Sequence, residues 1–422
     1  MTTQAAPTQA GAAAGSATPL HRMIAGQGVS TLGSTVTEIA MPLAALQLLG
    51  VEGWQLGLLA SLTAFPNLVL GIPAGAWIDR ARPKQVMIVC DLVRLVLMAG
   101  VPLAAAFGAL GFAQLCVVAA GVGCCTVLFD MAASSYLPRL VGIEHLIEAR
   151  SKQSTVRQLA DVIGQSGGGA LTSLVGGARA MAVDAASYAV SLVCLWGLPA
   201  MPAADRSEQP ESLVRRIGDG LRYTWKNGIN RFIVAEAGHY NLFYRAFMVV
   251  FMVHAVRDLH WSGTTIGILM ACMGVGAAVG ATLAPRCARR LGVGRAIITA
   301  LLVADLATLA TPFVTTGAVW AAVLLGVVFF VMNLGAFVSG VIAGSLNRAV
   351  TPEHLYGRIV GANRVISRGG ASLGGLLGGA LLTLFDNRVA SMICAVGMSA
   401  AIFWVARPSI ARVRELPTHE PA

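Results

Sequence analysis

Two charged side chains lie inside stretches that are otherwise apolar enough to cross a lipid bilayer. Glu38 lies in the first such stretch and Arg245 in the seventh. At about 1.5 Å per helical residue, each lies roughly 20 Å from the start of its stretch, so the two opposite charges have a similar depth. An ionisable group in lipid is costly unless it is paired or hydrated, which makes each one a functional candidate.

We hypothesise that Glu38 and Arg245 pair in one state of the protein and separate in another. A titratable acid whose pKa depends on such a partner can couple protons to a change of state. A permanent structural pair is one alternative, and the absence of any contact is the other.

Further acids in the apolar stretches are candidate proton sites. Glu236 and His239 lie one helical turn apart near the start of the seventh stretch, and histidine titrates near neutral pH. The alternative for this pair is a partly hydrated helix end. Asp161 lies in the lower part of the fifth stretch, where it could face a cavity or a helix interface.

Three more charged residues also lie within the apolar stretches. Asp91 and Arg94 are spaced i, i+3 in the third stretch, and we expect them to pair with each other or with the turn that precedes them. Asp305 lies in the middle of the ninth stretch, and the sequence identifies no partner for it.

The sequence argues against an enzyme. It contains no G-x-x-x-x-G-K-[ST] loop for nucleotide phosphates, and its His and Cys residues lack the spacing of metal ligands. The eight cysteines lie in or beside apolar runs, where they are expected to act as packing residues. We therefore expect no catalytic residues, no metal and no cofactor.

Composition indicates an integral membrane protein. The 422 residues are 56% hydrophobic and only 12% charged, with a mean hydropathy of +0.72, whereas soluble domains carry about 25% charged residues. The 48 glycines suit helices that pack closely in lipid.

Stretches of about 20 apolar residues, each sufficient to span a bilayer, predict twelve transmembrane helices. They lie at about 23–49, 55–77, 86–107, 111–135, 156–176, 178–198, 230–255, 264–285, 295–314, 317–343, 361–384 and 388–406. The predicted class is an all-α membrane protein.

Positive charge predicts the orientation. If the N-terminus is cytoplasmic, all but five of the 30 lysines and arginines fall on the cytoplasmic face; the five are Arg94, Arg179, Arg245, Arg257 and Arg388. This asymmetry is typical of plasma (inner) membrane proteins and places both termini in the cytoplasm. The net charge of +10 is then a topology signal with some contact to anionic lipid, and no nucleic-acid partner is expected.

The chain repeats itself at an offset of 210 residues. The sequence G-G-A-L at 168–171 recurs at 378–381, and Pro102 aligns with Pro312. A shift of six spans conserves orientation, so the repeat predicts a parallel duplication of a six-helix unit. The expected organisation is a disordered tail at 1–22, six-helix halves at 23–198 and 230–406, a linker at 199–229 and a second tail at 407–422. Within the linker, Leu213, Ile217, Leu221 and Trp225 share one face of an amphipathic helix, which is expected to lie in the cytoplasmic interface.

A charged turn separates the second and third spans. Gly75, Asp79, Arg80 and Lys84 have the spacing G-x-x-x-D-R-x-x-x-K. With twelve spans and a parallel repeat, this turn resembles the loop 2–3 signature of the major facilitator superfamily, where it acts as a conformational gate. The stretches V-D-A-A-S-Y at 183–188 and P-E-H-L-Y-G-R at 352–358 resemble the drug:proton antiporter branch that includes macrolide and enterobactin exporters.

The sequence departs from that branch in two places. Gln165 stands where exporters often carry the proline of G-P-x-x-G-G in the fifth span. The fourth span lacks the basic residue that many antiporters place there, and between 119 and 131 it holds only Asp130 as a charged group.

The resemblance implies that spans one, four, seven and ten line a central cavity. The candidate cavity residues are Gln27, Ser30, Ser34, Thr35, Tyr240, Asn241, Arg245 and Asn333. The implied function is secondary active transport by a monomer, with proton-coupled export of an amphiphilic drug, siderophore or secondary metabolite. Uptake, lysolipid flipping and a non-transporting membrane sensor are the alternatives.

Overall fold

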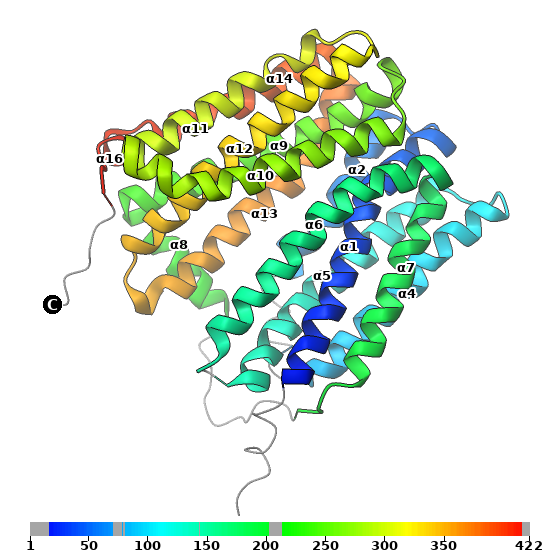
Figure 1. The fold of residues 1–422 in the computed structure, drawn as a ribbon, viewed down its shortest axis with the longest axis horizontal. Coiled ribbons are helices and arrows are strands. Elements are labelled where there is room, and N and C mark those ends of the chain that lie inside the picture. The colour runs from blue at the N-terminus through cyan, green and yellow to red at the C-terminus, as the bar shows by residue number, and fades with distance from the viewer. Residues whose placement is uncertain (1–16, 71–77, 79–80, 143, 202–212, 416–422) are drawn as a thin grey trace, which may run out of the picture.

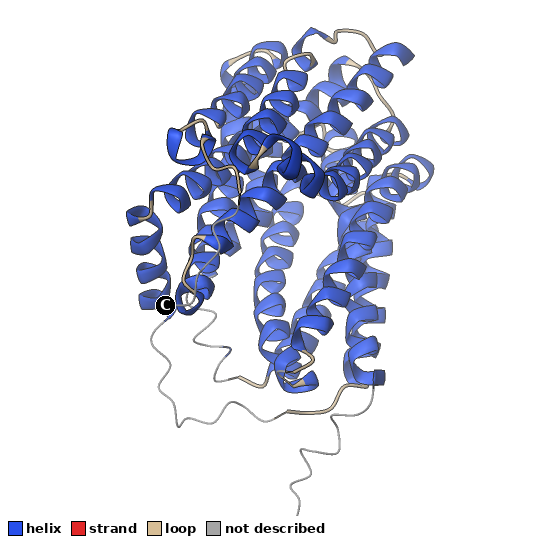
Figure 2. Cartoon of the chain, turned by 60° about the vertical axis from the view of Figure 1, so that its left-hand side comes forward, coloured by secondary structure: helices blue, strands red, loops and turns tan. Residues whose placement is uncertain are grey.

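The protein is a bundle of long helices in a computed structural model that describes residues 17–70, 78, 81–142, 144–201 and 213–415. No strand occurs within these ranges, and Figures 1 and 2 show helices joined by short connections. The all-helical class predicted from the composition is confirmed. Several turns are tight because glycine supplies a positive φ, for example Gly176 (85°) between α6 and α7 and Gly292 (83°) between α10 and α11.

Six helices form what we term the N-terminal half. They are α1 (Ala17–Leu48), α2 (Gly53–Leu70), α4 (Pro83–Ala106), α5 (Phe112–Val141), α6 (Leu146–Val175) and α7 (Gly177–Trp196). The first helix packs on α6 and α7, while α4 packs on α5 and α7. Pro83 begins α4 at a position where a missing backbone N–H is harmless.

The remaining long helices form the C-terminal half. They are α9 (Gly228–Val253), α10 (Gly263–Leu291), α11 (Val293–Thr308), α12 (Val319–Ala349), α13 (Glu353–Leu384) and α14 (Asn387–Ala400). Short elements complete it: η2 (His254–Asp258), η3 (Thr311–Phe313), α15 (Ile402–Val405) and α16 (Pro408–Ala411). Side-chain caps fix several helix starts; Asn227, Ser262 and Asp386 each accept a backbone N–H at the start of α9, α10 and α14.

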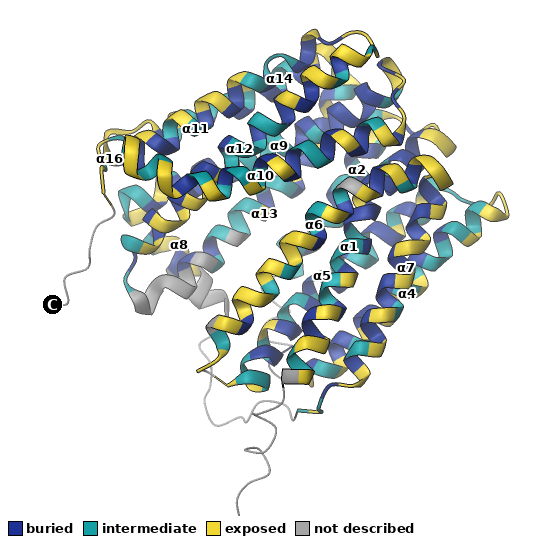
Figure 3. Ribbon diagram, in the orientation of Figure 1, coloured by how far each residue is buried: buried dark blue, intermediate teal, exposed yellow. Residues whose placement is uncertain are grey.

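Ten helices of the described chain are long and apolar enough to cross a membrane. The other two predicted spans correspond to α6 and α9, which carry charged residues along their length, such as Asp161 and Arg245. Large apolar side chains are exposed on the outer surface, including Val96, Val193 and Val323, and Figure 3 shows exposed residues along the outer helices. This pattern suits a surface that faces lipid; the count of twelve spans remains a prediction.

The two halves meet through two helix pairs, α2 with α13 and α6 with α10. Glycines bring the backbones together: a Cβ on Gly169 would lie 2.1 Å from the Cα of Gly267, and one on Gly57 would lie 2.6 Å from the Cα of Gly379. Both contacts lie toward the end of the bundle where α1 connects to α2. We call this the closed end and the opposite end the open end, toward which the halves diverge in Figure 1.

The linker contains a helix, α8 (Leu213–Lys226), as expected from its amphipathic pattern. It packs on α13 and α9. Its apolar side chains Leu221 and Trp225 are exposed by 37% and 50%, whereas Thr224 is fully buried.

Candidate functional site: a cavity between the halves

A cavity of about 800 Å³ lies between the two halves. Helices α1, α2, α5, α6, α7, α9, α10 and α13 all contribute to its walls. The lining runs from Met270 near the closed end to Arg150 and Gln153 near the start of α6. A site formed by both halves changes shape whenever they move relative to one another.

Glu38 and Arg245 both line this cavity, one from each half. Glu38 is exposed to the cavity and Arg245 is half-buried. Their charges lie close enough to interact, yet no ion pair of 4.0 Å or less joins them in the part of the chain described. The sequence therefore placed the two residues on facing walls, and the structure holds them apart.

A second acid lies on the N-terminal wall. Asp161 of α6 accepts a hydrogen bond from the hydroxyl of Thr35 at 3.2 Å, and Thr35 is one helical turn before Glu38. Toward the open end, the amide of Gln153 donates to Gln27 at 2.5 Å. Between the two alternatives for Asp161, the structure favours the cavity face.

The wall contributed by α1 is rich in hydroxyl groups. Ser30, Thr31, Ser34 and Thr35 all line the cavity. The hydroxyl of Ser34 lies 2.9 Å from that of Tyr188. These groups can donate and accept hydrogen bonds, so they can position a polar part of a ligand without fixing its charge.

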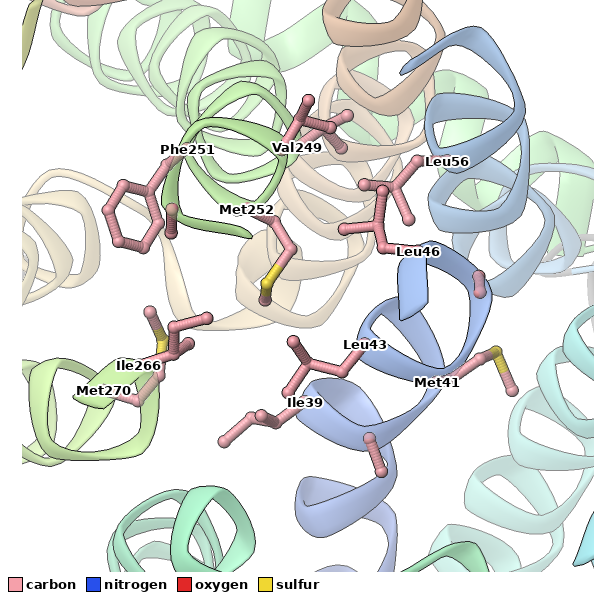
Figure 4. Close-up of a cluster of buried hydrophobic side chains, with 14 of the residues drawn as sticks. Ile39, Met41, Leu43, Leu46, Leu56, Val249, Phe251, Met252, Ile266 and Met270 are labelled. Carbon is pink, nitrogen blue, oxygen red and sulfur yellow. The ribbon is translucent and has the colours of Figure 1, made fainter. Parts of the chain in front are cut away.

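The closed end of the cavity is apolar. Figure 4 shows side chains of α1, α2, α9 and α10 gathered there, including Leu56, Val249, Met252 and Met270. Four methionines of α9 and α10 line this region: Met248, Met252, Met270 and Met273. Thioether side chains are flexible and polarizable, so such a wall can adapt to ligands of different shape.

Asp184 of α7 is a cavity residue that the sequence did not single out. It is 1% exposed and accepts hydrogen bonds from Thr37 at 2.7 Å, Ser187 at 3.2 Å and Ser34 at 3.5 Å. The spacing of Asp184, Ser187 and Tyr188 places the three on one helical face, which is the signal that could have identified it.

Asp91 and Arg94 form the ion pair predicted for the third span, with 3.3 Å between Nη1 and Oδ1. Arg94 also donates to the carbonyl oxygen of Cys125 at 2.8 Å. Its guanidinium lies over the rings of Phe129 and Tyr188, 4.7 and 5.3 Å from their centroids. Both charged residues are buried, so this cluster joins α4, α5 and α7 inside the N-terminal half.

Glu236 and His239 lie away from the residues that line the cavity. Glu236 is buried, and Asp305 of α11 lies close enough to interact with it electrostatically. The imidazole Nε2 of His239 donates to the carbonyl oxygen of Gly397 on α14 at 2.7 Å. The two candidate proton groups therefore face different neighbours.

Three further candidates also lie outside the lining. Tyr240 stacks on Tyr244 with 5.9 Å between ring centroids, and it is Tyr244 that faces the cavity. Asn241 donates to the carbonyl oxygen of Ala237 at 2.7 Å, and Asn333 donates to that of Phe329 at 3.3 Å. These amides bond to their own helices, and no described residue of α12 contributes to the cavity lining.

The charged turn at 71–84 is described only in part. Gly75, Asp79 and Arg80 lie outside the described residues. The ammonium group of Lys84 donates to the carbonyl oxygens of Trp196 at 3.1 Å and Leu198 at 2.6 Å. It thus satisfies free carbonyls at the carboxyl end of α7, where a positive charge is favourable.

The cavity offers acids and bases on opposite walls, among them Glu38, Asp161 and Arg245, together with a row of hydroxyls and an apolar end. Within the described ranges, no group of three His, Cys, Asp or Glu side chains is placed to hold a metal ion. The arrangement can bind a molecule that is polar at one end and apolar at the other, and its acids can exchange protons with water in the cavity.

Comparison with known proteins identifies the family. A family model described as transmembrane secretion effector matches residues 22–420. The multidrug efflux pump Tap of Mycolicibacterium fortuitum is 26% identical over 366 residues, which cover 83% of this chain and 85% of that protein. The enterobactin exporter EntS of Citrobacter koseri is 26% identical, and the match covers 84% of each protein.

Solved structures show the same fold. The nucleoside transporter NupG superposes with a TM-score of 0.69 at 16% identity, over 92% of this chain and 98% of that one. A bacterial homologue of the iron transporter ferroportin in its inward-facing state gives a TM-score of 0.70 at 13% identity, over 92% and 99%. With a family match over nearly its whole length, this chain belongs to the transmembrane secretion effectors of the major facilitator superfamily, which are multi-pass membrane transporters.

Proposed function

We propose that this transporter exports an amphiphilic small molecule in exchange for protons, by alternating access. The observation that carries the proposal is the placement of Glu38 and Arg245 on facing walls of one cavity, without an ion pair between them. A carboxylate in that position can hold a proton or interact with a substrate, and competition between the two produces exchange.

The open end is the cytoplasmic end in this proposal. The turns and linker at that end carry most of the lysines and arginines of the chain, as the positive-inside rule requires. Both termini then lie in the cytoplasm, and the protein spans the inner membrane. The cavity accordingly receives its substrate from the cytoplasm, which is the direction needed for export.

An amphiphilic substrate suits the two ends of the cavity. Its apolar part would pack against the methionines of α9 and α10, and its polar part against Ser30, Ser34 and Thr35. The named relatives, a multidrug efflux pump and an enterobactin exporter, support outward transport of such molecules.

Protonation of Glu38 would change the attraction between the halves. When Glu38 is ionised, its attraction for Arg245 favours an approach of the two cavity walls. A proton on Glu38 removes this attraction and releases Arg245. Asp161, which lies close enough to influence Glu38 electrostatically, is the second acid through which a proton can pass.

The test is proton release from vesicles that contain the purified protein, on addition of a panel of lipophilic drugs and siderophores. Glu38→Gln is compared with the parent, and Glu148→Gln is the matched control because Glu148 lies outside the cavity, paired with Lys152 at 2.7 Å. We expect substrate-dependent proton movement in the parent and the control, and its loss in Glu38→Gln.

Each other result contradicts a stated part of the proposal. Movement that persists in Glu38→Gln but disappears in Asp161→Asn assigns the proton site to Asp161. Substrate transport without proton movement refutes the coupling. No transport of any compound refutes the substrate class, and the same vesicles then test uptake and lysolipid flipping with labelled probes.

A further inference from the structure

A histidine at the closed end has a hydrogen-bond partner on each of its two ring nitrogens. His254 begins η2, the single π-helical turn that follows α9, and such turns are frequent at functional sites. It is 6% exposed. Its Nδ1 lies 2.7 Å from Oδ2 of Asp258, and its Nε2 lies 2.9 Å from the carbonyl oxygen of Val314.

Both ring nitrogens of His254 must donate a hydrogen. A backbone carbonyl can only accept, so Nε2 carries a proton. The Asp258 carboxyl is 41% exposed and also accepts from the amide of Asn387 at 2.6 Å, as an ionised group does. A neutral imidazole donates from one nitrogen only, so this arrangement selects the imidazolium form.

The same turn connects the two halves. Arg257 donates to the carbonyl oxygen of Val51 at 2.7 Å and lies 3.4 Å from that of Gly50. These carbonyls belong to the connection between α1 and α2, in the N-terminal half. The π-turn is thus held by the C-terminal half through His254 and attached to the N-terminal half through Arg257.

The other charged groups described near this turn do not contact His254 and have other partners or are exposed. Asp386 caps α14, Arg388 lies over an aromatic ring, and Glu52 accepts from an indole N–H. His260 follows the turn and is exposed. Among the residues that the structure describes, Asp258 is the titratable side chain that contacts His254.

We propose that His254 is a proton-sensitive latch that keeps the closed end shut. Its imidazolium holds the π-turn, and the turn holds Arg257 against the connection between α1 and α2. Loss of the proton removes one of the two hydrogen bonds and loosens the turn, so acid favours a shut closed end and alkali favours its opening. This inference rests on alternating access but not on proton-coupled export, because the latch sits away from Glu38 and the cavity.

The experiment measures opening directly, without substrate. Spin labels on p-acetylphenylalanine at Ala109 and Leu384, which are both exposed near the closed end, report the distance between the halves in nanodiscs. The parent, His254→Gln and His260→Asn are titrated between about pH 5 and 8, the range in which histidine changes charge. His260 is the matched control.

In the parent, we expect the ratio of molecules with an opened closed end to molecules with a shut one to rise about tenfold from the low to the high end of this pH range. This corresponds to the loss of one charge-assisted hydrogen bond. His254→Gln should remove the pH dependence, and His260→Asn should retain it. Asp258→Asn keeps the imidazole but removes its counter-charge, so it should reduce the difference in this ratio between the two ends of the titration. A parent ratio that does not change with pH, or a pH dependence that survives in His254→Gln, would overturn the proposal.

Discussion

Replacing Gly169 by alanine should force the closed end apart. In the described state, a Cβ at this position would lie 2.1 Å from the Cα of Gly267 and 2.7 Å from the carbonyl oxygen of Gly263. Ordinary contacts of a Cβ begin near 3.4 Å, so α6 and α10 must separate by more than an ångström. Backbone atoms form the contact, and no side chain can rotate away to make room.

The magnitude follows from the cost of overpacking a close helix contact, about 1–3 kcal/mol. A state with the closed end open does not bear this cost, because α6 and α10 are apart in it. The ratio of molecules in which the closed end has opened to molecules in which it is shut should therefore rise about 5- to 150-fold. Stability within each half should change little, because the clash lies between halves.

Spin-label distances across the closed end measure this ratio in nanodiscs. Gly340→Ala on α12 is the control, because a Cβ there meets nothing within 4 Å. A shift in Gly169→Ala that is absent from Gly340→Ala would support the reasoning. Identical distance distributions in Gly169→Ala and the parent would refute the view that this glycine contact holds the closed end shut.

Three further substitutions test the buried polar groups by thermal unfolding in detergent. Arg94→Leu leaves the buried carboxylate of Asp91 unpaired and should destabilise the protein by about 3–5 kcal/mol; Asp91→Leu combined with Arg94→Leu should recover much of that loss, and no recovery would contradict the pairing. Asp184→Ala removes the acceptor of three hydroxyl groups and should cost about 1–3 kcal/mol, whereas an unchanged unfolding temperature would show that the hydroxyls find other acceptors. Asp305→Val should stabilise the protein by about 1–3 kcal/mol, since both oxygens of Asp305 are buried without a hydrogen-bond partner in the described chain; a destabilised variant would show that this acid is held by an interaction of its own.

The sequence was informative where local spacing decides the outcome. Asp91 and Arg94 are three residues apart on one helix, so their pairing depends on helical geometry alone. The depth of Glu38 and Arg245 follows from counting residues along two helices, and this places both in the cavity. The amphipathic pattern of the linker likewise predicted α8.

Which residues of α9 line the cavity could not be predicted from local spacing. Asn241 and Arg245 share a helical face, but only Arg245 reaches the cavity. Near Asn241, Gly370 and Gly374 of α13 approach the backbone of α9 at Gly238 and Leu242. That approach is a tertiary contact between residues more than 100 positions apart, and periodicity does not reveal it.

The hydrogen-bond partners of His254 could not be predicted from local spacing either. Asp258 is four residues away, but Val314 and Asn387 come from distant parts of the chain. Asp184 was overlooked for a related reason, because two of its three hydroxyl donors come from α1.

The anchoring of the segment after α7 limits how far the halves can move. Lys84 binds the carbonyl oxygen of Leu198, and the hydroxyl of Tyr136 donates to that of Pro199 at 2.8 Å, so the linker starts from a fixed point on the N-terminal half. It enters α8 at Leu213, and this helix packs on α13 of the C-terminal half. A chain of that length spans at most about 50 Å, whatever conformation it adopts. The linker is therefore a tether of defined reach, and its two anchor points, one on each half, cannot move farther apart than this.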